Sequence, residues 1–132
     1  MRILAVCLAW LASLLPHHGH VLHGRGTIFG PPDRDRWHGS HHACTLGPRW
    51  RAADRDARAL YAAGRFVAHP SLPCWARVQV CSEASGRCLV GVVADRGPRH
   101  ALVDLWHVLA RELRHDGGVV SLTTYPEGAP TP

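Results

Sequence analysis

The sequence predicts a mainly β protein, a small closed barrel with one or two short helices. Short strand-like segments recur along the chain, and Gly- or Pro-containing turns separate them. Residues 76–81 alternate between apolar and polar side chains, and only two stretches have a helical pattern. The chain has 132 residues, which is enough for one domain with one core.

The first third of the chain is expected to contain one short strand and one helix. Residues 17–25 are rich in His and Gly and are expected to be flexible, and Gly26–Phe29 is the first strand candidate. Residues 30–43 have loop composition. Asp54 is a good N-cap for a helix that runs to residue 63, where the following Gly ends it.

The middle of the chain predicts a β-hairpin over residues 76–94. Val78 and Val80 share one face of the first strand, as in a half-buried strand. Ser85-Gly86 is a turn signal, and residues 89–94 form a second apolar strand.

The last third predicts a helix followed by a strand. Leu105, Leu109 and Leu113 recur at four-residue spacing, so a helix is expected to begin at Asp104. Residues 119–124 are the last strand candidate. The tail over residues 126–132 is rich in Pro and is expected to be loose.

Residues 1–23 are expected to be a signal peptide followed by a flexible His-rich segment. Arg2 supplies the positive charge, the apolar run over residues 3–15 is short for a membrane span, and Pro16 ends it. The protein is therefore expected to be exported, to a periplasm or the cell exterior. If the signal stayed uncleaved, it would be the one membrane contact.

Four cysteines remain after such a signal, and an even number in a small exported domain predicts two disulfides. Three pairings are possible. We favour Cys81–Cys88, which would close the hairpin, together with Cys44–Cys74. Zinc is the competing interpretation, but no close Cys-x-x-Cys pair is present.

Composition narrows the possible partners. The net charge is +5 and all 15 basic residues are Arg, which suits an anionic surface. No basic cluster is interleaved with aromatic residues, so no nucleic acid is expected. The 11 His residues show no strict ligand spacing, so neither a metal nor another cofactor is expected.

Five sequence blocks resemble, in order, the double-psi β-barrel domains of the rare lipoprotein A (RlpA) and expansin type. They span about residues 24–125, and the fourth lies nine residues after the Asp of the third. The blocks are Gly26-Thr27-Ile28-Phe29-Gly30, residues 67–73 (Val-Ala-His-Pro-Ser-Leu-Pro), residues 92–98 (Val-Val-Ala-Asp-Arg-Gly-Pro), Val103-Asp104-Leu105 and Gly118-Val119-Val120.

The resemblance implies a six-stranded double-psi barrel whose groove binds peptidoglycan or a related β-1,4-linked glycan. In the lytic members the Asp matching Asp104 is the catalytic acid/base, and the Asp matching Asp95 supports it. Those members cleave between sugars and leave an anhydro end, whereas expansin-like members loosen wall polymers without cleavage. Trp106 and Arg114 depart from the family pattern, since a Ser and a Gly usually stand there.

The residue chemistry leaves two interpretations of Asp104 open. As a general acid it needs a raised pKa, which an apolar surround and the nearby Asp95 would supply. As a helix N-cap its pKa would be lowered by amide donors and the helix dipole. A transglycosylase needs one acid/base residue only, because a hydroxyl of the substrate closes the ring.

Four further residues are candidates for binding the glycan. Thr27 and His69 could hydrogen-bond the carboxylate or the sugar, and Trp37 and Trp75 could stack on sugar rings because they flank loops. The protein is expected to act as a monomer. A third interpretation is a secreted barrel that binds a protein partner or inhibits an enzyme.

Overall fold

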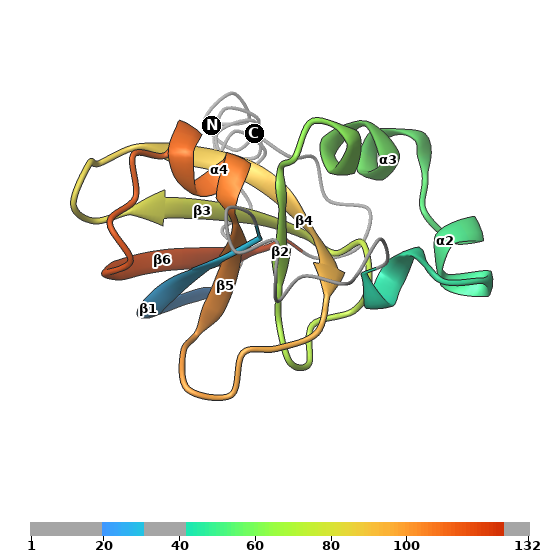
Figure 1. Ribbon diagram of the computed structural model, residues 1–132, viewed down its shortest axis with the longest axis horizontal. Helices are drawn as coiled ribbons and strands as arrows, with labels where there is room; N and C mark the ends of the chain where they lie inside the picture. Colours follow the sequence, from blue (N-terminus) through green and yellow to red (C-terminus); the bar gives the residue numbers. More distant parts are fainter. Residues whose placement is uncertain (1–19, 31–41, 126–132) are drawn as a thin grey trace, which may run out of the picture.

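The structure, a computed structural model, describes residues 20–30 and 42–125, which form a closed barrel (Figure 1). Its strands are β1 (Val21–Phe29), β2 (Phe66–Ala68), β3 (Arg77–Ser82), β4 (Cys88–Asp95), β5 (Val103–Trp106) and β6 (Val119–Thr124). Its helices are the 3-10 helix η1 (Ala43–Thr45) and the α-helices α2 (Pro48–Arg51), α3 (Arg55–Ala62) and α4 (His107–Glu112).

The six strands pair in the order β1-β5-β2-β4-β3-β6 and close on themselves. The pairs β1–β5 and β2–β4 are parallel, and the remaining pairs are antiparallel. The predicted mainly β closed barrel is therefore confirmed. Its mixed six-stranded topology is compatible with a double-psi barrel.

Strand β1 is longer than expected and changes partner along its length. Residues 21–25, which were expected to be flexible, pair with β6, and residues 26–29 pair with β5. That prediction is wrong because local composition does not show that β6 lies alongside. The strand begins at Val21, three residues before the expected start of the domain at residue 24.

The hairpin and the first helix are confirmed. Strands β3 and β4 pair antiparallel, and Val78 and Val80 are fully buried, as the alternation predicts. Helix α3 begins after Asp54, whose side chain accepts a hydrogen bond from the amide of Ala57 at 2.7 Å. Gly64 follows the helix in the left-handed region, with φ +77°.

The second helix was placed three residues too early. Asp104 lies inside strand β5, and α4 begins at His107 with Trp106 as its N-cap residue. The error came from the four-residue spacing of Leu105, Leu109 and Leu113, which is typical of one helix face. All three are fully buried in one core, but they come from a strand, a helix and the helix end.

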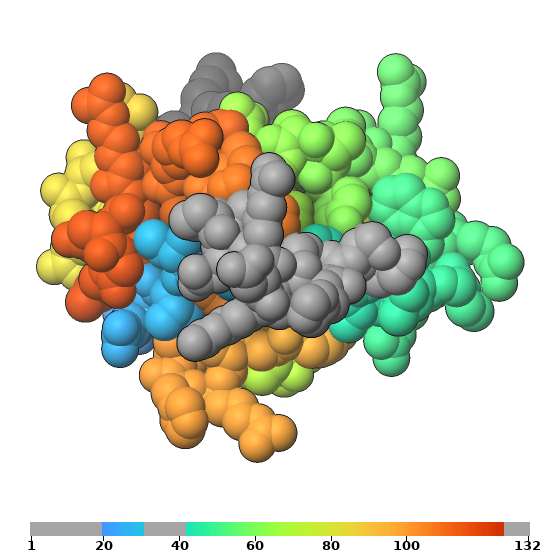
Figure 2. Space-filling view, in the orientation of Figure 1, coloured from blue at the N-terminus to red at the C-terminus, as the bar shows by residue number. Residues whose placement is uncertain are grey.

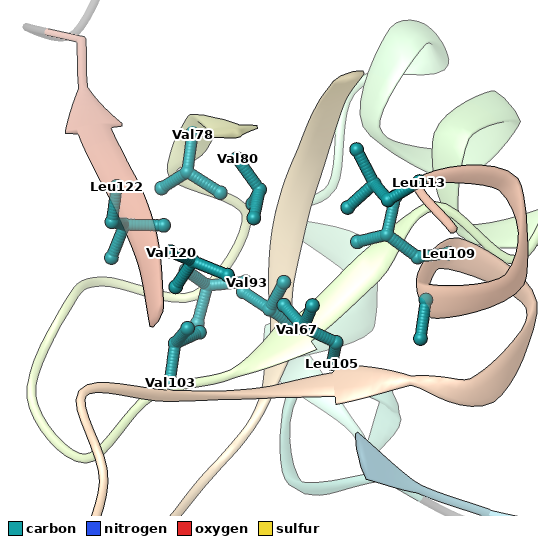
Figure 3. Packing of buried hydrophobic residues seen from close by; sticks show 11 residues of the cluster. Val67, Val78, Val80, Val93, Val103, Leu105, Leu109, Leu113, Val120 and Leu122 are labelled. Atoms are coloured by element: carbon teal, nitrogen blue, oxygen red, sulfur yellow. The ribbon is translucent and has the colours of Figure 1, made fainter. Parts of the chain in front are cut away.

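One buried cluster fills the barrel. Figure 3 shows valine and leucine side chains from β2–β6 converging, with α4 closing one end. The members of this cluster are Val67, Val78, Val80, Val93, Val103, Leu105, Leu109, Ala110, Leu113, Val120 and Leu122.

A second cluster lies outside the barrel, between β2 and β4 on one side and the segment from η1 to α3 on the other. Phe66 and Val92 supply the sheet side of this cluster, and Cys44, Ala57 and Trp75 pack against them. The α2 and α3 region projects at the right of the molecule, and the β4–β5 connection projects below (Figures 1 and 2).

Both favoured disulfides are present. Cys44–Cys74 joins η1 to the segment before β3, and Cys81–Cys88 joins opposite residues of the hairpin. Two disulfides indicate an oxidising, extracytoplasmic setting. Among residues 20–30 and 42–125, no helix has the length and apolar content needed to span a membrane.

Candidate active site

Four neighbouring strands bring Thr27, Asp104, Ala68 and Asp95 into one lateral row, which we call the carboxylate row. Thr27 on β1 is opposite Asp104 on β5, and Asp104 is opposite Ala68 on β2. Ala68 is in turn opposite Asp95 on β4. With strands about 4.8 Å apart, the two aspartate backbones lie roughly 10 Å from each other.

A register shift between Val67 and Ala68 completes this row. Val67 is opposite Val93, but the next residue, Ala68, is opposite Asp95, so β4 carries one extra residue at this point. Such a bulge re-aims the side chain that follows it. The bulge therefore decides which face of the sheet carries the Asp95 carboxylate.

Asp104 is presented by a strand and does not cap a helix. Along β5 the residues Val103 and Leu105 are fully buried in the barrel, while Asp104 and Trp106 are half-buried on the other face. The N-cap interpretation is wrong because both neighbours of Asp104 in the sheet are strands. A position inside a strand does not present the unpaired amide donors of a helix N-terminus, which would have lowered its pKa.

The surroundings of Asp104 favour a protonated carboxyl group. Burial raises the pKa of Asp104, the Thr27 hydroxyl lowers it in part, and the negative charge of Asp95 raises it further. Within the described part of the chain, the buried oxygen Oδ1 of Asp104 has no hydrogen-bond partner. An ionised carboxylate would leave that oxygen uncompensated, so the neutral acid is stabilised.

Thr27 lies beside Asp104 in the sheet, and its hydroxyl has two acceptors in reach. Its Oγ1 lies 3.4 Å from the carbonyl oxygen of Val103, which is long for a hydrogen bond. A hydroxyl has one hydrogen to donate and can turn it to the Asp104 carboxylate instead. Thr27 is therefore placed to orient the carboxyl group of Asp104.

Asp95 is held as a fixed anion. Its carboxylate accepts hydrogen bonds from the amides of Ala43 and Arg96, each at 2.9 Å, and Oδ2 lies 3.1 Å from Nδ1 of His42. Burial raises the pKa of Asp95, but the bonds from His42, Ala43 and Arg96 outweigh burial and lower it overall. Asp95 and Asp104 thus have pKa values shifted in opposite directions.

His42 is a site residue that the sequence analysis missed. Its ring is 5% exposed and packs against Phe29, Phe66 and Trp106 while contacting Asp95. The sequence placed His42 in a His-rich stretch with no distinguishing spacing. Only the fold brings η1 across the sheet to β4.

His69 lies next to the carboxylate row, but one of its ring nitrogens accepts hydrogen bonds within a turn. Nδ1 accepts hydrogen bonds from the amides of Ser71 and Leu72, at 3.1 and 3.0 Å. Burial and the nearby Arg96 lower the pKa of His69, which favours the neutral ring. Arg96 also donates to the carbonyl oxygens of His69 and Leu72, so it stiffens the same turn.

Trp75, expected to stack on a sugar, is 7% exposed and belongs to the second cluster. Its indole donates a hydrogen bond to the carbonyl oxygen of Arg49 and packs against Trp50 and Tyr61. The expected role is wrong, because a buried ring cannot offer a face to a ligand. The other candidate, Trp37, lies outside the described residues.

Trp106 is the tryptophan that shares a face with the carboxylate row. It lies two residues beyond Asp104 on the same face of β5, stacks on Phe66 at 4.9 Å between ring centroids, and contacts Phe29 edge-on. In residues 103–106, Asp104 and Trp106 alternate with the aliphatic Val103 and Leu105, and this period of two could have indicated the shared face.

No protein-family model matches this chain, and no curated protein matches its sequence.

Proposed function

We propose that this protein is an exported peptidoglycan-binding protein that cleaves the glycan strand as a lytic transglycosylase, with Asp104 as the acid/base. The observation that carries the proposal is the raised pKa of the half-buried Asp104 beside the anionic Asp95. A general acid must hold a proton near the working pH, and this environment favours that state. The resemblance to RlpA-like domains supports the same residue for the same role.

One carboxyl group is enough for the whole reaction. The neutral Asp104 donates its proton to the glycosidic oxygen, the bond from the anomeric carbon to that oxygen breaks, and its electron pair goes to the leaving sugar. The primary hydroxyl of the cleaved sugar then bonds to the anomeric carbon and gives its proton back to Asp104. The product carries an anhydro end, and the enzyme returns to its starting protonation state.

The two aspartates are assigned different tasks. Their backbones are roughly 10 Å apart, with the buried Ala68 between them. Asp95 is tied to His42, Ala43 and Arg96, so we assign it the electrostatic role of raising the pKa of Asp104.

A non-catalytic, expansin-like binding module is the alternative. The half-buried rings of Phe29 and Trp106 beside the carboxylate row favour it, because aromatic rings bind sugars whether or not cleavage follows. In that case the glycan would be held, and Asp104 would contribute hydrogen bonding.

The two functions differ in their products. The refolded, oxidised protein is incubated with purified peptidoglycan sacculi, both intact and stripped of stem peptides, and pellet and supernatant are examined. The proposed enzyme releases soluble fragments with anhydro ends from one or both substrates. Co-sedimentation without soluble fragments would exclude the enzyme and leave the binding module. If the protein neither releases fragments nor co-sediments, both functions are excluded.

A further inference from the structure

A hollow of about 330 Å³ lies beside the carboxylate row, where the end of α3 meets α4. The green surface of α3 and β2 adjoins the orange surface of α4 in Figure 2. Four ring side chains and four small or aliphatic residues form its wall, and we call it the aromatic hollow. The wall residues are His42, Tyr61, Ala62, Ala63, Gly64, Phe66, Trp106 and Val108.

The wall of the aromatic hollow indicates an uncharged ligand. None of its residues is Asp, Glu, Lys or Arg. Its volume is at the lower end of the range of about 300–1,000 Å³ for small-molecule sites. A hollow of this size suits one ring of a ligand and is too small for a folded segment of a protein partner. Phe66 is buried and contacts Tyr61 at 4.8 Å and Trp106 at 4.9 Å between ring centroids, so the half-buried rings of Tyr61 and Trp106 provide the aromatic surface of the hollow.

Two wall residues connect the aromatic hollow to the carboxylate row. His42 lines the hollow and contacts Asp95 through Nδ1 at 3.1 Å. Trp106 lines the hollow from the same face of β5 as Asp104, and the two-residue step along the strand places their backbones about 7 Å apart. A linear ligand can therefore occupy the hollow and the row at the same time.

Tyr61 gives the apolar wall one polar group of fixed protonation. Burial raises the pKa of its phenol, and the negative charge of Asp95 raises it further. The phenol is thus neutral over the physiological range and can both donate a hydrogen bond to a ligand hydroxyl and accept one.

We infer that the aromatic hollow binds one neutral pyranose ring of a β-1,4-linked glycan while a neighbouring linkage lies over the carboxylate row. This inference depends on the proposed function for the class of ligand. An aromatic surface covers the apolar face of a pyranose, and a wall without Asp, Glu, Lys or Arg suits an uncharged sugar such as N-acetylglucosamine. The hollow would then hold the substrate in place for Asp104.

The test uses the tetramer of N-acetylglucosamine, a neutral β-1,4-linked probe, and amide chemical shifts of the full oxidised protein. Ala63→Trp fills the hollow from its rim. Ala52→Trp is the matched control, because Ala52 and Ala63 are both exposed alanines at the C-cap of a helix and Ala52 does not line the hollow.

We expect saturable shifts at Gly64 and Val108 in the wild type. Binding should weaken by about tenfold or more in Ala63→Trp and by less than about twofold in Ala52→Trp. Because the wall has no Asp, Glu, Lys or Arg side chain, added salt should change the affinity by less than about twofold. Absence of shifts at Gly64 and Val108, equal binding by both variants, or steep salt dependence would overturn the inference.

Asp104→Asn separates this inference from the proposed function. It should keep the shifts at the hollow, since Asp104 is not part of the wall. Anhydro products from the wild type without any response at the hollow would overturn the inference and leave the enzyme standing. A response at the hollow without anhydro products would support the inference and exclude the enzyme.

Discussion

Asp95 and Asp104 are opposite the same residue, Ala68, from the two strands that flank it. The pKa of Asp95 is lowered by its hydrogen bonds, and that of Asp104 is raised by burial and by the charge of Asp95. Two carboxyl groups with pKa values moved in opposite directions allow one to stay ionised while the other holds a proton. The predictions below follow from this pair and from the segments that position it.

Asp104→Asn should not destabilise the protein at neutral pH. Because the folded pKa of Asp104 is raised, the folded state binds its proton more tightly than the unfolded state does. The free energy of unfolding therefore falls as the pH rises above the ordinary value of 3.8 and through the raised pKa. We expect the variant to equal or exceed the wild type by up to about 1 kcal/mol at pH 7, and to lose that advantage in acid.

Urea unfolding at pH 7 and at about pH 3.5 measures this difference. Asp56→Asn is the matched control, since Asp56 is exposed on α3. If Asp104→Asn lowers the free energy of unfolding at pH 7 by more than about 2 kcal/mol, the ionised Asp104 is not destabilised in the folded protein, contrary to this prediction.

Asp95→Asn should move the basic limb of the pH–activity profile to lower pH. The charge of Asp95 raises the pKa of Asp104, so its removal lets Asp104 lose its proton at lower pH. The variant also loses charged acceptors for His42 and Ala43 and is expected to be about 2 kcal/mol less stable, so the rates are measured well below its unfolding temperature. If the basic limb stays at the same pH or moves to higher pH, Asp95 does not have this electrostatic role.

The two disulfides should differ in their effect on the site. Cys44–Cys74 spans 30 residues and holds η1, which carries Ala43 to Asp95, whereas Cys81–Cys88 spans 7 residues of a hairpin that is already paired. Chain entropy gives about 3.5 kcal/mol for the first and about 2.5 kcal/mol for the second.

Replacing each pair by serines tests this contrast. We expect the Cys44/Cys74 variant to lose stability and glycan cleavage, and the Cys81/Cys88 variant to retain cleavage when assayed in its folded state. Equal losses of cleavage from folded samples of both would show that the link through η1 is not needed.

Arg114→Gly should stabilise the protein. Arg114 follows α4 with φ +50°, a conformation that costs a residue with a side chain about 1–2 kcal/mol. Glycine's extra unfolded-state entropy offsets part of this, which leaves a gain of about 0.5–1 kcal/mol in the free energy of unfolding. Arg111→Gly, inside the same helix, should instead cost about 1 kcal/mol. Equal losses in the two variants would contradict strain at Arg114.

Sequence patterns predicted the elements whose signals are local. The alternation around Val78 and Val80 gave the hairpin, and the Asp54 cap gave α3. Asp104 was assigned to a helix because Leu105, Leu109 and Leu113 have helical spacing, although the barrel gathers them from different elements. Asp104 lies in a strand because β5 pairs with strands that are distant in sequence, and a short sequence window carries no information about such pairing.

The site was predictable only in part for the same reason. Asp95, Asp104 and Thr27 lie in one lateral row because each is at a matching register position on its own strand. The contact of His42 with Asp95 depends on η1 crossing the sheet, 53 residues away in sequence. Trp75 was expected to stack on a sugar because it flanks a loop, yet the packing of α2 and α3 buries it.

The central claim is that Asp104 donates the proton that breaks the glycan strand. Mass spectrometry of the fragments released from purified peptidoglycan, for wild type, Asp104→Asn and Asp56→Asn, tests it most directly, with co-sedimentation on the same sacculi as the measure of binding. The account predicts anhydro-ended fragments from wild type and Asp56→Asn, and none above background from Asp104→Asn, while all three bind. Anhydro fragments formed by Asp104→Asn at the wild-type rate, or by none of the proteins, would contradict it.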